Sequence, residues 1–180
     1  TSHISIVDKY GNTLSMTSTI ESSFGSNLMT KSGFLLNNEL TDFSFISHSG
    51  GKLVANRIEP GKRPRSSMSP TIIFKENKPI YIIGSPGGSN IIGFVLNAII
   101  GLLDWDMNVQ EAASIPHAIN KFGNFDIEAG TRRINMKQSL EEMGYKVNLK
   151  EFFSGLNIIE VKDKIYGGSD PRREGVAIGG

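Results

Sequence analysis

Thr1 combines two reactive groups, because a first residue carries a free α-amino group beside its side-chain hydroxyl. A hydroxyl is a weak nucleophile by itself, and an N-terminal amine is one of the bases that activate it. This pairing suits attack on an acyl group, with the amine taking the hydroxyl proton. We therefore hypothesise that Thr1 is a nucleophile. The alternative is that the sequence starts at a cut in a longer chain, and the first residue alone does not decide between the two.

A glycine-rich turn at 84–90 (Gly-Ser-Pro-Gly-Gly-Ser-Asn) could supply a second part of such chemistry. It follows an apolar run that ends at Ile83 and precedes another, 91–103, of helical length. Bare backbone N–H groups at the start of a helix favour negative charge, and an oxyanion hole requires such donors. The turn lacks the Lys-Ser/Thr ending of a P-loop and the spacing of a dinucleotide fingerprint, so phosphate binding is the weaker interpretation.

Two polar clusters could hold a charged ligand. The carboxylates Glu39 and Asp42 follow two asparagines and the apolar run 33–36, which we predict to be a buried strand. They could bind a cationic group, or they could simply cap a loop, as Asn and Asp often do. Ser66 and Ser67 lie between two prolines that restrain the backbone. Their hydroxyl and amide groups could bind a carboxylate, and the alternative is a basic surface turn.

The elements that position these groups follow from the apolar pattern. Alternation on either side of 8–12 predicts a hairpin with strands 1–7 and 13–20, the second rich in hydroxyl side chains that include Thr19. A second hairpin, 71–83, leads into the glycine turn. Further helices are predicted at 108–113 and 135–143, and further short strands at 146–149, 156–161 and 164–166.

Composition excludes several classes of protein. With 180 residues, 38% of them hydrophobic and 21% charged, the sequence is typical of one folded domain. A net charge of +1 gives no electrostatic reason to expect a nucleic-acid partner. There is no cysteine, and the three histidines carry no metal-ligand spacing, so we expect no metal and no cofactor. The longest apolar run, 91–103, is too short to span a bilayer.

Five stretches, each moderately specific, occur in one order along the sequence. They are 1–3 with 8–12, 33–39 with 42–43, 62–64 with 66–71, 84–88, and the Asp-Pro-Arg-Arg run 170–173. Together they resemble the small, catalytic subunit of γ-glutamyltranspeptidase (γ-glutamyltransferase). The resemblance covers nearly the whole chain and is weakest from 118 to 166. It favours the interpretation of Thr1 as a nucleophile over that of a chain cut by chance.

The resemblance implies the four-layer αββα sandwich of the N-terminal nucleophile hydrolases. Such proteins are made as one precursor that cuts itself and releases the catalytic threonine as a new N-terminus. Residues 1–180 would then be a single catalytic subunit that supplies about half of the fold, with a large subunit from the same precursor supplying the rest. By analogy with the family, the location would be periplasmic, secreted or at the cell surface.

The resemblance also implies a role for each site residue. Thr1 would be the nucleophile of both self-cleavage and acyl transfer, and Thr19 would hydrogen-bond its hydroxyl. Gly87 and Gly88 would form the oxyanion hole. The reaction would be γ-glutamyl transfer and hydrolysis from glutathione-like donors, through an ester on Thr1 that water or an amino-acid or peptide acceptor resolves.

Substrate recognition is implied at both ends of the γ-glutamyl group. Its α-amino group would face Glu21, Glu39 and Asp42, and its α-carboxylate would bind Ser66 and Ser67 with an arginine of the large subunit. Some members have amides at the two glutamate positions, so this site would be more acidic. The stretch 44–61 is shorter than in members that cover the site with a lid loop. The alternative function is therefore that of a poly-γ-glutamate depolymerase or transpeptidase of the same family, with an open site that takes the polymer.

Overall fold

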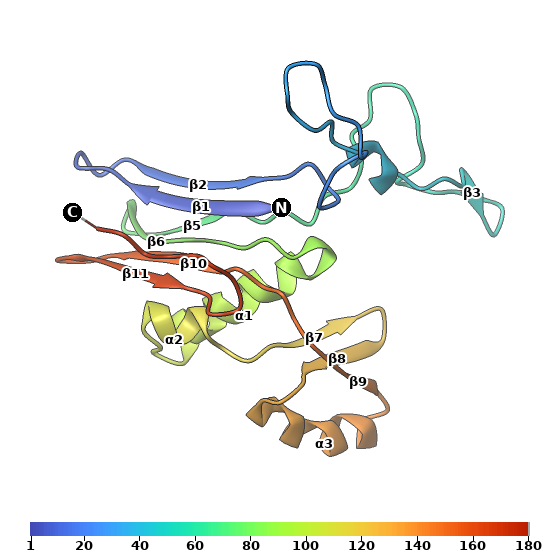
Figure 1. The fold of residues 1–180 in the computed structure, drawn as a ribbon. Helices are drawn as coiled ribbons and strands as arrows, with labels where there is room; N and C mark the ends of the chain where they lie inside the picture. The colour runs from blue at the N-terminus through green and yellow to red at the C-terminus, as the bar shows by residue number, and fades with distance from the viewer. Residues whose placement is uncertain (180) are drawn as a thin grey trace. The chain divides into compact units, whose positions relative to one another are not determined.

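The computed structural model describes residues 1–179 and divides the chain into two compact units. The first unit consists of Thr1 and residues 18–67, and the second consists of residues 2–17 and those from Met68 onward. Figure 1 labels the helices and strands of both units.

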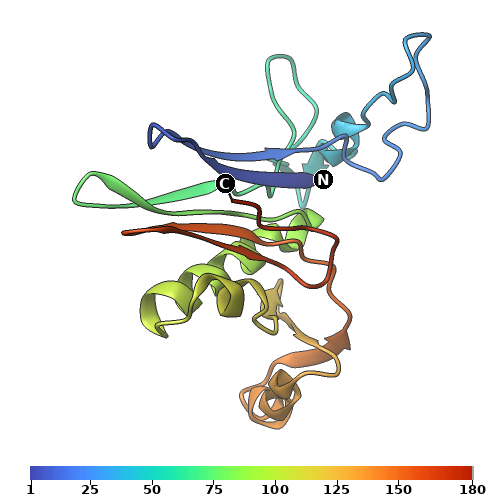
Figure 2. The ribbon, with the colours of Figure 1, turned by 60° about the vertical axis from the view of Figure 1, so that its left-hand side comes forward.

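The second unit is built on a four-stranded antiparallel sheet. The strands, in spatial order, are β11 (Ile165–Ser169), β10 (Asn157–Val161), β6 (Lys78–Gly84) and β5 (Thr71–Lys75). β5 and β6 form the predicted hairpin, and β10 pairs with β6 from the other side. Two helices, α1 (Ile91–Asp104) and α2 (Val109–Ala113), cover one face of the sheet (Figures 1 and 2).

Packing between α1 and the sheet forms the hydrophobic core. The buried face of α1 carries Ile91, Phe94, Val95, Ala98 and Leu102, a spacing that places them on one side of a helix. These side chains meet strand residues such as Ile83 and Ile158, which are 0% and 1% exposed. The side chain of Asn108 caps α2, with a complete capping box to Glu111.

A hairpin of β1 (Ser2–Val7) and β2 (Thr13–Ser18) lies on the opposite face of the sheet (Figures 1 and 2). Its inward face is polar: the Ser5 hydroxyl donates to the Asn157 carbonyl at 3.2 Å, and the Ser15 hydroxyl donates to the Ile83 carbonyl at 2.9 Å. Its outward face is apolar and 41–48% exposed, and consists of Ile4, Ile6, Leu14 and Met16. This unit therefore shows a helical layer and two β layers, with an uncovered apolar surface on the outer one.

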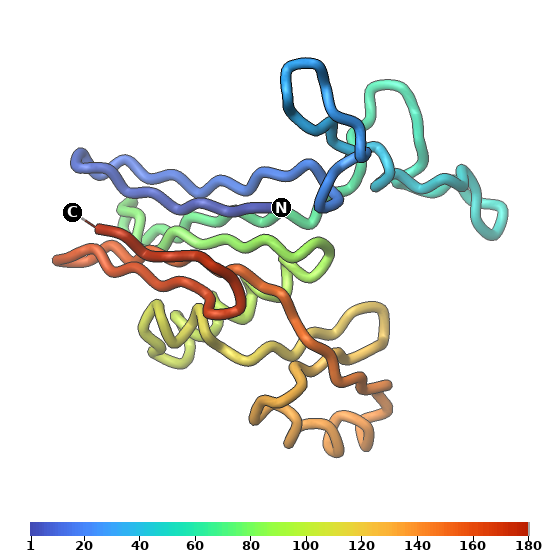
Figure 3. Tube along the Cα trace, in the orientation of Figure 1, coloured from blue at the N-terminus to red at the C-terminus, as the bar shows by residue number. Residues whose placement is uncertain are grey.

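The segment 170–179 returns along β10 and β1 (Figure 3). Its last residues, 175–179, help to line a cavity of about 930 Å³ together with His3, Asn157 and Lys164. Its first residues, Asp170–Arg173, contact buried groups of this unit. The chain after β11 is therefore an integral part of the second unit.

A small sheet completes the second unit. Its strands are β7 (Ala118–Lys121), β8 (Asn124–Glu128) and β9 (Lys146–Lys150), with β8 and β9 parallel. The connection between β8 and β9 contains the 3-10 turn η3 (Arg132–Met136) and helix α3 (Lys137–Glu142). The predicted helix at 135–143 is thus shorter and begins as a 3-10 turn.

The first unit contains little regular structure. It has one 3-10 turn, η1 (Glu39–Asp42), and a hairpin of two-residue strands, β3 (His48–Ser49) and β4 (Lys52–Leu53). The prediction of a buried strand at 33–36 is wrong. Phe34 is 58% exposed, and Leu35 makes only an isolated bridge to Met29. An apolar run becomes a buried strand only where neighbouring strands cover it, and in this unit none does.

Candidate active site

The side chains of Thr1 and Thr19 lie together in the first unit. Their hydroxyl oxygens are 2.9 Å apart, and either one can donate the hydrogen. The Thr19 oxygen also accepts the backbone N–H of Glu21 at 2.9 Å, which fixes its position. Thr1 is half-buried, so its hydroxyl is neither enclosed nor fully solvated. An oriented hydroxyl beside an α-amino group is the arrangement that nucleophilic attack requires.

Glu21 is held next to this pair by Ser22 and Asn38. The Ser22 hydroxyl donates to its carboxylate at 2.6 Å, and the Asn38 side-chain amide donates to the same oxygen. The Ser22 bond contributes most to a lowered pKa of Glu21, and the Asn38 bond and the positive charge of the Thr1 amine also lower it, against the opposing effect of burial. Glu21 adopts a φ of +72°, a left-handed backbone conformation that is unusual for a residue with a side chain.

Asn38 is the centre of this hydrogen-bond network. Its amide nitrogen also contacts the Ser22 and Thr41 hydroxyls at 3.1 Å each, and its carbonyl oxygen accepts the Ser22 backbone N–H at 3.0 Å. The sequence interpretation treated the asparagine doublet only as a possible loop cap and gave Asn38 no role. The only sequence feature that could have indicated a role for Asn38 is its position next to Glu39 and near Asp42.

Glu39 and Asp42 both belong to η1 and share the electrostatic environment of Glu21. Partial burial raises the pKa of Glu39, and the negative charges of Asp42 and Glu21 raise it further. The three predicted carboxylates are therefore close enough to repel one another. A cation bound among them would relieve that repulsion.

Ser66 and Ser67 lie in the same unit, in a segment without regular secondary structure. The backbone N–H of Arg65 donates to the Asn56 side chain at 3.0 Å and so anchors the start of the pair. Ser66 is exposed and Ser67 half-buried. Both serines therefore have surface that solvent can reach.

The glycine turn belongs to the second unit, where Gly87 and Gly88 adopt φ values of +136° and +57°. A side chain at Gly87 would overlap the ring of Phe94, whereas the space around Gly88 is open. The turn continues through η2 (Gly88–Asn90) into α1. Asn90 occupies the N-cap position of α1 but makes no capping bond, and its side chain instead accepts from Lys121 at 3.2 Å.

A family model described as gamma-glutamyltranspeptidase matches residues 1–180. The chain belongs to the γ-glutamyltranspeptidase family. It is 38% identical to the glutathione hydrolase proenzyme of Bacillus subtilis strain 168 over 99% of its length, and 40% identical to that of Escherichia coli K12 over 96%. It spans only 30% and 31% of those two relatives.

Solved members of the γ-glutamyltranspeptidase family include separate chains of the same extent. A Helicobacter pylori γ-glutamyltranspeptidase with a threonine-to-alanine mutation is 40% identical, with a TM-score of 0.88. The match covers 96% of this chain and 100% of the Helicobacter pylori chain. The Bacillus anthracis transpeptidase CapD is 27% identical, with a TM-score of 0.79 over the whole of both chains. A cephalosporin acylase from Bacillus halodurans, 22% identical with a TM-score of 0.82, shares the fold. These neighbours have the N-terminal nucleophile hydrolase fold, and the mixed α/β structure of this chain matches it.

His3 is an uncharged packing residue in this member of the γ-glutamyltranspeptidase family. Its ring nitrogens lie 2.8 Å from the Thr17 hydroxyl and 3.1 Å from the Ser5 hydroxyl. Burial lowers the pKa of His3 to about 4. The ring fills the space beside Gly84, where any side chain would overlap it. His3 is therefore held as a neutral spacer between β1 and β6.

No group of three metal-ligating side chains occurs among residues 1–179. Over the same residues, no helix has the length and apolar character needed to cross a membrane.

Proposed function

We propose that this chain is the small, catalytic subunit of a γ-glutamyltransferase and glutathione hydrolase. The observation that carries the proposal is the 2.9 Å contact between the Thr1 and Thr19 hydroxyls in a chain of this family. The donor would be a glutathione-like γ-glutamyl compound, and the acceptor would be water or the amine of an amino acid or peptide. By family analogy, the enzyme would work in the periplasm, outside the cell or at the cell surface.

In the proposed reaction, the Thr1 hydroxyl attacks the γ-carbonyl carbon while the α-amino group of Thr1 takes the hydroxyl proton. The backbone N–H groups of Gly87 and Gly88 would stabilise the negative oxygen that forms. Collapse of this intermediate breaks the amide bond, and the leaving amine takes the proton from the Thr1 ammonium. Water or an acceptor amine then attacks the Thr1 ester, passes its proton to the same α-amino group and regenerates the free hydroxyl.

The first unit supplies the groups proposed to bind the γ-glutamyl head. The α-ammonium of the substrate would bind among Glu21, Glu39 and Asp42, because it would neutralise carboxylates that repel one another. Ser66 and Ser67 would hold the α-carboxylate, with an arginine of the large subunit. Charge-assisted hydrogen bonds of this kind are stronger than neutral ones.

A large subunit, cut from the same precursor, would complete the αββα sandwich. Two observations support this. The chain spans about 30% of proenzyme relatives yet all of a solved chain. The outer face of the β1–β2 hairpin exposes four apolar side chains, Ile4, Ile6, Leu14 and Met16. A helical layer supplied by the large subunit would bury them and give residues 1–180 their place as one catalytic subunit.

The proposal is tested by a Thr1→Ala variant of the precursor, with Thr13→Ala as the control on the neighbouring strand. We expect Thr1→Ala to remain uncut and to release no product from a γ-glutamyl anilide, whereas Thr13→Ala is cut and active. Turnover of the anilide by Thr1→Ala would refute the assignment. The alternative donor is tested on the natural enzyme, where a strong preference for poly-γ-glutamate over glutathione would replace the first choice.

A further inference from the structure

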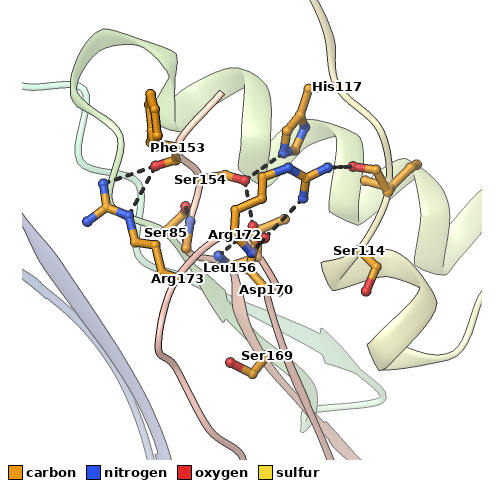
Figure 4. Close-up of polar contacts among 12 residues, drawn as sticks. Ser85, Ser114, His117, Phe153, Ser154, Leu156, Ser169, Asp170, Arg172 and Arg173 are labelled. Carbon is orange, nitrogen blue, oxygen red and sulfur yellow. Dashed lines mark hydrogen bonds and ion pairs between the residues drawn. The ribbon is translucent and has the colours of Figure 1, made fainter. Parts of the chain in front are cut away.

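A buried polar network lies in the second unit, behind the glycine turn. Its members His117, Ser154 and Asp170 are 0%, 0% and 2% exposed. The Ser154 oxygen lies 2.5 Å from the Asp170 carboxylate and 2.9 Å from His117 Nε2 (Figure 4). Arg172 pairs with Asp170 at 3.0 Å and with Glu128 at 2.6 Å. The network therefore joins β8, the segment before β10 and the Asp-Pro-Arg-Arg run.

The direction of each hydrogen bond follows from the donors available. Ser154 donates its single hydroxyl proton to the Asp170 carboxylate, so the same oxygen accepts from His117. His117 must then carry its proton on Nε2, while Nδ1 has no partner among the described residues. Burial, with a contribution from the Arg172 charge, lowers the pKa of His117 to about 4. The imidazole is thus neutral and fixed in one tautomer.

Serine, histidine and aspartate are the residue types of a hydrolytic triad, but their arrangement here differs. A triad aspartate bonds to the histidine, whereas Asp170 bonds to Ser154 and Arg172. The serine of a triad must also reach its substrate, and Ser154 is completely buried. This network therefore holds structure and does not carry out attack.

One route from the network leads to the start of the turn. Asp170 accepts the backbone N–H of Leu156 at 3.2 Å as well as the Ser154 hydroxyl, so it fixes the chain on both sides of Gly155. The Gly155 N–H then donates to the Ser85 hydroxyl oxygen at 3.0 Å. A Cβ at Gly155 would lie 2.8 Å from the Pro86 ring, so this backbone packs directly against Pro86.

A second route leads to the glycines themselves. The His117 ring lies 4.3 Å from the Phe94 ring, centroid to centroid. The same Phe94 ring occupies the space where a side chain on Gly87 would stand. Ser154 takes part in both routes, because it bonds to His117 and also lies next to Gly155.

We propose that Ser154, held by Asp170, is a positioning residue that sets the orientation of the Gly87 and Gly88 N–H groups. This inference rests on the proposed function of the turn as an oxyanion hole. Oxyanion donors act on charge that appears only in the transition state, so a displaced turn lowers kcat and leaves donor binding nearly unchanged. A general loss of protein stability would not lower kcat selectively in this way.

The test compares Ser154→Ala with Ser169→Ala in the processed, two-subunit enzyme. Ser169 is a matched control, because its buried hydroxyl has no hydrogen-bond partner among the described residues. For Ser154→Ala we expect kcat on a γ-glutamyl anilide to fall about 10- to 100-fold, since a 1 Å misplacement can cost about 10²-fold. KM should change less than about twofold, and amide hydrogen exchange of the peptide 84–90 should become faster. Ser169→Ala should match the natural enzyme in all three measurements.

Unchanged kcat and unchanged exchange in Ser154→Ala would overturn the inference, as would equal effects in both variants. If Ser154→Ala does not yield processed enzyme, Ser85→Ala replaces it, because that change removes the acceptor of the Gly155 N–H, together with the Ser85 bond to the Pro86 carbonyl at 2.6 Å. Faster exchange and lower kcat in Ser85→Ala support the inference, and no change in either overturns it. An inactive natural enzyme would refute the proposed function, while the exchange comparison would still decide whether Ser154 positions the turn.

Discussion

Residues 18–67 and the second unit bury apolar side chains to very different extents. In the first unit, Phe43 is a buried hydrophobic side chain at 7% exposure, whereas many others are open to solvent. The exposed ones are Phe24, Leu28, Met29, Phe34, Leu36, Leu40, Phe45, Ile46, Leu53 and Ile58. The second unit has a continuous core between α1 and its sheet. The first unit is therefore stabilised by polar side-chain bonds and by any partner that covers its exposed apolar side chains. The second unit is stabilised by its own hydrophobic packing.

This difference separates the two kinds of chemistry expected of the protein. Glu21, which is proposed to bind the charged substrate, and Asn38, which holds its carboxylate, lie in the loosely packed unit. Backbone donors that must not move, those of Gly87 and Gly88, lie in the well-packed unit. Changes in the second unit should therefore act on turnover. In the first unit, changes at the proposed nucleophile Thr1 and its partner Thr19 should also act on turnover, and changes at the proposed substrate-binding side chains mainly on binding.

The largest effect is expected at Gly87. Gly87→Ala places a methyl group on the Phe94 ring at a φ of +136°, so the turn must move. We expect kcat to fall about 10²–10³-fold, as for loss of an oxyanion donor. Gly88→Ala meets open space and should lose less than about tenfold, because only the strain of its φ of +57° opposes it. Steady-state kinetics on a γ-glutamyl anilide decide, and a larger loss at Gly88 would contradict this view of the turn.

Acid sensitivity should be a property of the second unit. His117 is buried and neutral with a pKa of about 4, against 6.5 when unfolded. Below pH 6.5 the unfolded state binds more protons than the folded state, so the free energy of unfolding falls between pH 6.5 and about pH 4. Below about pH 4, His117 causes no further loss. The loss is up to about 3 kcal/mol for His117, and smaller for the partly exposed His3.

Urea unfolding of the processed enzyme between pH 7 and pH 4 measures this loss. His117→Gln should flatten the pH dependence. His48→Gln should leave the dependence unchanged, because His48 is exposed in the first unit. A pH dependence that is the same in both variants would show that the buried imidazole does not control acid stability.

A smaller effect, on binding, is expected at Glu21. Glu21→Gln removes a charge that would bind the substrate ammonium, and a charged hydrogen bond contributes about 1.5–3 kcal/mol. We expect KM for the donor to rise about 10- to 100-fold, with a smaller change in kcat. Glu76→Gln, on the exposed β5–β6 turn, is the control and should change neither constant. A pure kcat effect at Glu21 would remove the distinction between the two units.

The smallest effect is expected at Thr19. Thr19→Val removes the hydroxyl that lies 2.9 Å from the Thr1 hydroxyl and keeps the shape of the side chain. One net hydrogen bond contributes about 0.5–1.5 kcal/mol, so kcat should fall about 2- to 10-fold. The rate at which an electrophilic glutamine analogue labels Thr1 should fall by the same factor. Full activity in Thr19→Val would mean that this hydroxyl does not orient the nucleophile.

The second unit was largely predictable from the sequence, and the first was not. Alternation, turn residues and the apolar pattern predicted both hairpins, α1 and α2, because each of these signals is local. The run 33–36 was wrongly predicted to be a strand, since its apolar side chains have no strand partner within this unit. Asn38 and Phe94 were missed as supports of the site for another reason. Their roles come from contacts with residues distant in sequence or from backbone geometry that no local pattern reveals.

The close packing of His3 on Gly84 joins the third residue of the chain to the end of β6. Neither position can vary alone. A larger residue at position 84 would displace the imidazole of His3. A smaller residue at position 3 would leave a void and would leave the Thr17 and Ser5 hydroxyls without the partner that they share. Homologous sequences should therefore change at both places together. A double-mutant cycle on the pair should show that the two costs do not add.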